Sequence, residues 1–140
     1  MKSLTFAILT GLMTSACAGT ANRLDVAADA ELTRLVSNRV AGKPVHCINL
    51  RQIRSSHVVA RKAIIYEVSH RLFYVNQPRW GSESLSNDSV LMSRTSSSSL
   101  CDGEIIRLLD PSLNERGAIA LSEFVPYLAD PRRMSARPKP

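Results

Sequence analysis

Residues 57–76 read HVVARKAIIYEVSHRLFYVN and are rich in β-branched and aromatic side chains. Such side chains favour β-strands because they pack well on a pleated, half-buried surface. The apolar runs are short and are separated by polar residues, which predicts three strands near 57–60, 63–68 and 71–76. Between the last two, Ser69 and His70 are expected to form the turn of a hairpin.

Short runs of apolar and β-branched residues also occur on both sides of this segment. It predicts four further strands, near 47–53, 90–94, 104–109 and 118–121, joined by loops that contain glycine, proline or runs of serine. Seven short strands with short links are typical of a small antiparallel barrel or rolled sheet, with a sandwich as the alternative. The predicted fold class is therefore mostly β, or α+β by strict count, with one N-terminal helix.

That helix is expected over Asp25 to Val40. An apolar stripe at helical spacing supports it, formed by Leu32, Leu35, Val36 and Val40. Gly42 is the expected terminator, and Pro44 cannot continue a helix. We interpret the stripe as the side of the helix that faces the core.

The first 18 residues have the layout of a secretory signal peptide. Lys2 gives a positive start, residues 4–13 are uncharged and mostly apolar, and small residues follow. Cleavage before Cys17, as in bacterial lipoproteins, would make Cys17 the lipidated first residue and anchor the protein to a membrane. Cleavage after Ala18, at an A-x-A site, would instead release a soluble protein into the periplasm.

The rest of the chain is predicted to form one globular domain, residues 19–127, followed by a basic, proline-rich and disordered tail, residues 128–140. Hydrophobic residues make up 44% of the chain and charged residues 21%, which excludes a wholly disordered protein. No apolar run reaches the roughly 18 residues that span a bilayer, which excludes a multi-pass membrane protein.

The chain has three cysteines, an odd number that is unusual in an exported protein. Assigning Cys17 to the signal peptide or to the lipid leaves Cys47 and Cys101 as a pair. The periplasm is oxidising, so these two are predicted to form a disulfide bond. Two free thiols and a metal site are the alternatives, although the chain has no C-x-x-C motif.

Charge is unevenly distributed along the chain. Residues 51–79 carry six cationic side chains against Glu67 alone, whereas residues 83–130 carry eight carboxylates against three arginines. In one interpretation the basic and acidic blocks fold against each other and their charges cancel. In the other, the basic side chains share an exposed face that binds anionic lipid or polysaccharide, and the candidate contacts are Arg51, Arg54, Arg61, Lys62 and Arg71. Nucleic acid is not an expected partner of an exported protein.

The sequence offers little that points to catalysis. It contains no nucleophile elbow, zinc-protease, P-loop or dinucleotide-binding motif. Its histidines, at positions 46, 57 and 70, lack metal-ligand spacing. Asp102 and Glu104 alternate onto one side of a predicted strand, where they would be either an acid–base pair or two solvated carboxylates. We therefore predict no catalytic, cofactor-binding or metal-binding residues.

Three segments carry a resemblance to a protein family: residues 40–55, residues 100–106 and residues 124–127. They resemble small exported alphaproteobacterial proteins, many with lipoprotein-like signals, that share a domain of unknown function. Members commonly carry two further cysteines, in regions that here are residues 77–81 and 117–121 and contain none. The resemblance implies that a second disulfide has been lost as a unit, which supports the Cys47–Cys101 pair.

These observations favour a non-enzymatic binding or structural module of the bacterial cell envelope. A protein inhibitor of a host or competitor enzyme and a small periplasmic enzyme are the alternatives. A pocket that gathers titratable side chains would favour the enzyme, and a flat surface with a protruding loop, for example around Trp80, would favour binding.

Overall fold

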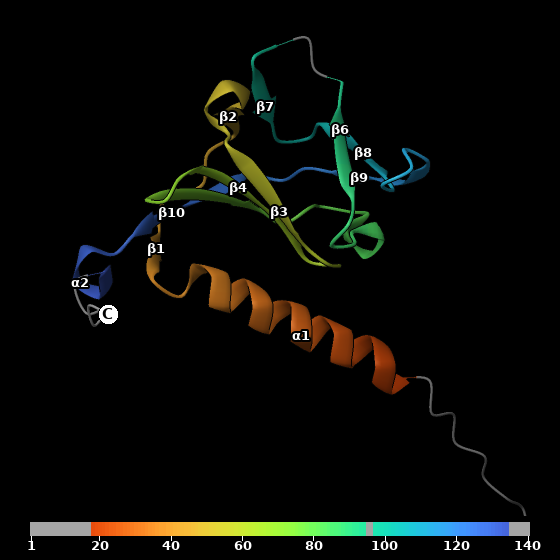
Figure 1. The fold of residues 1–140 in the computed structure, drawn as a ribbon, viewed down its shortest axis with the longest axis horizontal. Helices are drawn as coiled ribbons and strands as arrows, with labels where there is room; N and C mark the ends of the chain where they lie inside the picture. Colours follow the sequence, from red (N-terminus) through yellow and green to blue (C-terminus); the bar gives the residue numbers. More distant parts are fainter. Residues whose placement is uncertain (1–17, 95–96, 135–140) are drawn as a thin grey trace, which may run out of the picture.

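The computed structural model describes residues 18–94 and 97–134. Helix α1 (Ala18–Val36) lies on one face of a five-stranded antiparallel sheet, and two smaller antiparallel sheets lie on the opposite face (Figure 1). The predicted fold class, mostly β with one N-terminal helix and antiparallel strands, is confirmed. The strands are distributed over three sheets, an arrangement compatible with a rolled sheet.

The five-stranded sheet has the order β1-β10-β5-β4-β3. Its strands are β1 (Arg39–Ala41), β10 (Phe124–Ala129), β5 (Leu72–Asn76), β4 (Ala63–Ser69) and β3 (Ser55–Val59). The three strands predicted from residues 57–76 are therefore present and adjacent. The turn between β4 and β5 lies one residue later than predicted, because Ser69 pairs with Leu72 and leaves His70 and Arg71 between the strands.

The two smaller sheets complete the fold. One pairs β2 (Cys47–Asn49) with β7 (Ser99–Cys101), and the other has the order β6 (Val90–Ser93), β8 (Ile105–Leu109), β9 (Glu115–Ala120). The strand predicted over residues 47–53 is shorter than expected. It ends at Asn49, whose side chain accepts a hydrogen bond from the Arg51 amide and begins a 3-10 turn over Leu50–Gln52.

Strand β4 is the centre of the core because both of its faces are buried. On one face Ile64 and Tyr66 contribute to the inter-sheet cluster, which lies between the five-stranded sheet and the smaller sheets and also contains Ile48, Val58, Leu85, Leu100, Ile106, Leu108, Ile119, Leu121 and Phe124. On the other face lies the helix-side cluster, formed by Ala28, Leu32, Val59, Ala63, Ile65 and Val75. Burial on both faces explains why residues 63–66 form a continuous apolar run.

The helix prediction was right in kind but wrong in its bounds. Helix α1 ends at Val36, and Val40 lies in strand β1, where its side chain is exposed. Pairing of residues 39–41 with residues 127–129 of β10 extends the backbone before Gly42 is reached, so Gly42 does not terminate the helix. No helix in the described part of the chain is both long and apolar enough to cross a bilayer.

The C-terminal boundary also differs from the prediction. Strand β10 continues to Ala129, two residues beyond the expected end of the domain, and a short helix, α2 (Pro131–Met134), follows it. Residues 135–140 of the predicted tail, and residues 1–17 of the predicted signal peptide with Cys17, lie outside the described residues.

Candidate functional site

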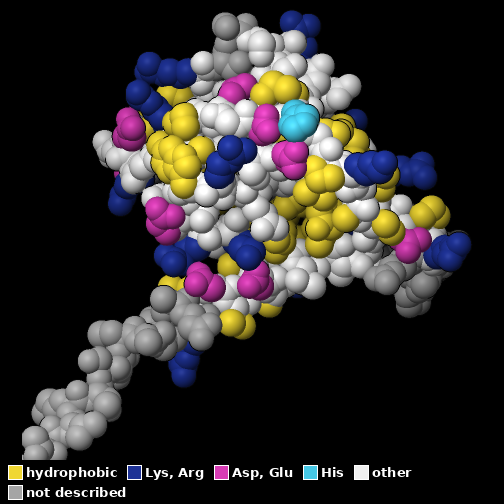
Figure 2. Space-filling view, turned by 180° about the vertical axis from the view of Figure 1, so that it is seen from behind, with side chains coloured by type: hydrophobic (Ala, Val, Ile, Leu, Met, Phe, Trp, Pro, Cys, Tyr) yellow, Lys and Arg dark blue, Asp and Glu magenta, His cyan; other side chains and the backbone are white. Residues whose placement is uncertain are grey.

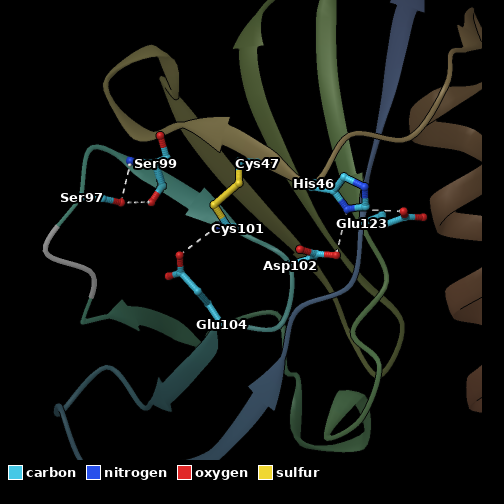
Figure 3. The surroundings of a disulfide bond; sticks show 8 residues. All are labelled: His46, Cys47, Ser97, Ser99, Cys101, Asp102, Glu104 and Glu123. Atoms are coloured by element: carbon cyan, nitrogen blue, oxygen red, sulfur yellow. Dashed lines mark hydrogen bonds and ion pairs between the residues drawn. A yellow bond between two sulfur atoms is a disulfide. The ribbon is translucent and has the colours of Figure 1, made fainter.

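The predicted disulfide between Cys47 and Cys101 is present and joins strands β2 and β7 (Figure 3). The two residues are directly opposite in the register, and the neighbouring hydrogen bond runs from the Asp102 amide to the His46 carbonyl. The cysteines therefore occupy a non-hydrogen-bonded pair, the kind in which Cα atoms approach most closely. Their Cα atoms lie 4.0 Å apart, and the bond leaves neither thiol free as a nucleophile or ligand.

The residues next to the two cysteines belong to a compact group of ionisable side chains. The Nδ1 atom of His46 lies 3.1 Å from a carboxylate oxygen of Asp102 and 3.6 Å from one of Glu123. Figure 3 shows the imidazole pointing to both carboxylates, which come from different segments of the chain. We call these three residues the His46 cluster.

The two carboxylates change the acidity of the imidazole. The hydrogen bond to Asp102 and then the negative charges of Asp102 and Glu123 raise the pKa of His46 above its ordinary value. The imidazole is largely exposed to solvent, with a side-chain exposure of 74%, so these interactions act in a wet environment. The His46 cluster therefore holds a proton more tightly than a free histidine does.

Asp102 and Glu104 do not act together as the sequence pattern suggested. Gly103 has a φ of 80° and places Asp102 in a turn, so strand alternation begins only after it. The Glu104 carboxylate accepts a hydrogen bond from the Cys101 amide, whereas Asp102 contacts His46 (Figure 3). Of the two alternatives considered for Asp102 and Glu104, the geometry does not support the acid–base pair, because the two carboxylates have separate partners.

The sequence analysis did not identify Glu123, which is brought to the site by a buried polar side chain. Asn76, at the end of β5, is fully buried. Its amide donates a hydrogen bond to the Ser122 carbonyl, and its oxygen accepts one from the Ser122 amide at 3.3 Å. Because a buried amide without partners is costly, these bonds fix the turn that presents Glu123. The sequence carries no signal for this turn, because the burial of Asn76 becomes visible only in the structure.

Two members of the His46 cluster also line an open pocket with a volume of about 410 Å³. Its polar lining consists of Gln77, Arg79, Asp102, Ser122 and Glu123, and its apolar lining of Val75, Val125 and Tyr127. We call it the Tyr127 pocket. On the face drawn in Figure 2, a histidine lies beside acidic side chains, with basic side chains and an apolar strip nearby.

The predicted basic contacts do not form one surface. Arg61 and Lys62 lie in the β3–β4 turn and pair with Asp25 and Asp29 of α1, Lys62 at 2.7 Å. Arg54 and Arg71 lie at the opposite end of the hairpins, because the Arg54 amide bonds to the Glu67 carbonyl and Arg71 follows β4. Arg51 precedes Arg54 in the 3-10 turn.

The basic side chains of residues 51–79 are not neutralised by residues 83–130, as one interpretation expected. Instead, helix α1 supplies the carboxylates that pair with Arg61 and Lys62. Within residues 83–130, Arg107 pairs with Glu115 and Arg116 with Asp110. Among the described residues, Arg51, Arg54 and Arg71 form no ion pair within 4.0 Å.

A second histidine has one acidic partner among the residues that the structure describes. His57, in β3, places Nε2 3.2 Å from a carboxylate oxygen of Glu31 in α1. His57 thus resembles His46 in its distance to a carboxylate and in its exposure. It differs in lacking a third ionisable group among the described residues of the ion-pair network.

Comparison with known proteins finds no similarity that bears on this site. The chain matches no family model, no curated protein and no solved structure.

Proposed function

We propose that this chain is an exported protein of the bacterial cell envelope that acts as a non-enzymatic binding module, with the Tyr127 pocket as its ligand site. The signal-like residues 1–18 and the disulfide support export, because a structural disulfide persists in the oxidising periplasm.

The observation that carries the proposed binding role is the composition of the Tyr127 pocket. Arg79 offers hydrogen-bond donors, Asp102 and Glu123 offer acceptors, and Gln77 offers both. A sugar hydroxyl both donates and accepts, so a saccharide matches this mixed set better than a purely anionic or purely apolar ligand does. The ring of Tyr127 and the side chain of Val125, both partly exposed, supply apolar surface for the C–H faces of a sugar ring.

We propose further that the protein is anchored through Cys17. That residue immediately precedes α1, so the anchor would meet the N-terminal end of the helix. Helix α1 has 19 residues and is about 28 Å long at 1.5 Å per residue. Its other end approaches β1, and the Arg39 side chain bonds to the His70 carbonyl in the β4–β5 turn.

This arrangement separates the anchor from the exposed arginines Arg51, Arg54 and Arg71. They lie at the end of the sheet far from the start of α1, well beyond the roughly 8 Å over which salt screens surface charge. For an anchored protein, these three residues are therefore better placed to contact an anionic polysaccharide than the headgroups of its own leaflet. Arg61 and Lys62 lie nearer the anchor, but α1 supplies their counter-charges.

Binding to cell-wall glycan fragments tests the proposed ligand class. We expect Arg79→Ala and Gln77→Ala to weaken binding, measured by titration calorimetry and by NMR shifts at Tyr127. Arg94→Ala is the matched control, because it removes an exposed arginine that lies outside the pocket and outside the proposed polysaccharide contacts. Equal weakening by Arg94→Ala would indicate non-specific charge attraction, and absence of binding to neutral glycans would contradict the saccharide proposal.

Fractionation of cells tests the anchor. The wild-type protein should be found with membranes, and Cys17→Ser should release it. Mass spectrometry of the native N-terminus provides the direct measurement: an unmodified Gly19 would show that cleavage occurs after Ala18 and that no lipid is attached.

A further inference from the structure

We propose that the His46 cluster binds a divalent transition-metal ion, with Zn²⁺ as the best match, through His46 Nδ1 and one carboxylate oxygen each of Asp102 and Glu123. This site shares Asp102 and Glu123 with the proposed saccharide pocket, but the argument for it does not rest on saccharide binding. The argument rests on the spacing of the three donor atoms, on the way the fold holds them, and on their chemistry.

The spacing of the donors is close to that of a tetrahedral zinc site. Zinc–nitrogen and zinc–oxygen bonds of roughly 2.0–2.2 Å place neighbouring ligand atoms about 3.3–3.5 Å apart. The distances from His46 Nδ1 to the two carboxylates are 3.1 and 3.6 Å, and all three donor atoms lie within 4.8 Å of one another. The Glu123 side chain is half-exposed, so it has room to rotate and bring its oxygen closer to that of Asp102.

The fold holds the backbone of each donor residue. His46 and Asp102 adjoin the two cysteines of the disulfide, and the Asp102 amide bonds to the His46 carbonyl at 2.7 Å. Glu123 lies between Ser122, held by Asn76, and the fully buried Phe124, whose backbone exchanges two hydrogen bonds with Val45. Three separate segments are therefore fixed before an ion arrives, which lowers the cost of ordering the ligands.

The chemistry of the donors selects the class of ion. An imidazole nitrogen suits zinc, copper or nickel, whereas calcium and magnesium prefer a complete set of oxygen ligands. Two carboxylates balance the charge of a divalent ion. Three protein donors leave a fourth position for water, and Asp102 and Glu123 line the Tyr127 pocket, so that position is accessible to a ligand.

The test is a titration of Zn²⁺ alone into the oxidised protein carrying Cys17→Ser, after metal removal with a chelator. The Cys17→Ser change excludes zinc binding by that thiol. We expect one zinc per chain, counted by native mass spectrometry. His46→Gln, Asp102→Asn and Glu123→Gln should each weaken binding at least about tenfold, a loss seen even when only a hydrogen-bond partner of a metal ligand is changed. Magnesium should not compete.

His57→Gln is the matched control, because His57 is an exposed histidine at 3.2 Å from a carboxylate but outside the cluster. Retained affinity in His57→Gln together with loss in the three cluster variants supports the proposal. Absence of saturable one-to-one binding, or equal affinity in all variants, overturns it and leaves the His46 cluster as an ion pair only. Glycan binding measured with chelator present reports separately on the saccharide proposal.

Discussion

The two faces of the five-stranded sheet are covered in very different ways. The inter-sheet cluster draws large buried side chains from both layers, including Phe124, Ile64, Leu100 and Leu108, and the disulfide lies close to one side of it. The helix-side cluster is smaller, and Ala28 and Leu32 are the buried residues that α1 contributes among its described side chains, residues 23–36. Leu35 and Val36 pack against it while partly exposed.

This difference indicates how stability is distributed. Apolar area removed from water is the main favourable term in folding, so the inter-sheet cluster should carry most of the stability. A helix held by few buried side chains and by exposed ion pairs is expected to open at lower free energy than the sheets. The predictions below test this ranking.

The largest effect is expected from Phe124→Ala. This side chain is fully buried, and its ring lies 5.9 Å from the ring of Tyr66. Its removal should leave a cavity and lower the free energy of unfolding by about 3–5 kcal/mol, measured by chemical denaturation. Leu128→Ala, on the same strand but 53% exposed, is the control and should change it by no more than about 0.5 kcal/mol. A similar loss in both variants would contradict the assigned core.

Removal of the disulfide should rank next. The cross-link spans a sequence separation of 54 residues, for which the chain-entropy model gives about 4 kcal/mol. We expect the Cys47→Ala/Cys101→Ala variant to lose about 2–5 kcal/mol relative to the oxidised protein, again by denaturation. Cys17→Ser should have no such effect. Unchanged stability in the double variant would show that β2 and β7 are held by packing alone.

Leu32→Ala tests the helix-side cluster directly. Leu32 lies at the edge of this smaller cluster, where the site can relax, so the loss should be near the lower end of the usual range, about 2–3 kcal/mol. Hydrogen exchange should show faster exchange of α1 amides while β4 and β5 stay protected. Faster exchange throughout the sheet instead would mean that the helix and the sheet unfold as one unit.

The ion pairs of α1 should matter less. Asp29→Asn breaks the 2.7 Å contact with Lys62, and Asp25→Asn breaks the contact with Arg61. Exposed pairs contribute little after solvent screening, so each variant should lose at most about 0.5 kcal/mol at low salt and less at high salt. A loss that does not shrink with salt would point to packing rather than charge.

The smallest effect concerns His46 and the way its protonation makes the free energy of unfolding depend on pH. Because the pKa of His46 is raised in the folded protein, its interaction with Asp102 stabilises the fold below the unfolded pKa and is lost as pH rises through the folded pKa. An NMR titration in chelator should therefore give a pKa for His46 above 6.5. Asp102→Asn should lower that pKa more than Glu123→Gln does. The reverse order would contradict the geometry.

Local pattern predicted the strands within residues 57–76 well, but it did not predict β1, β7 or β10, and it indicated long-range geometry poorly. The strands within residues 57–76 were predictable because each is bounded by its own turn, and the disulfide was predictable from the cysteine count and the expected compartment. The end of α1 was mispredicted, since Val40 fits a helical stripe and only pairing with Leu128 shows that it belongs to a strand. Glu123 could not be predicted, because its position depends on a buried contact with Asn76, 46–47 residues earlier in the chain.

The position of β10 has a consequence for the timing of folding. This strand lies between β1 and β5, yet it is the last of the described strands in chain order. In synthesis or translocation that proceeds from the N-terminus, β1 has no neighbour in its sheet until the chain reaches Tyr127–Ala129. The disulfide of Cys47 likewise cannot form until Cys101 has been made, 54 residues later. The five-stranded sheet therefore cannot be completed before β10 has been made, although β3, β4 and β5 can already pair with one another.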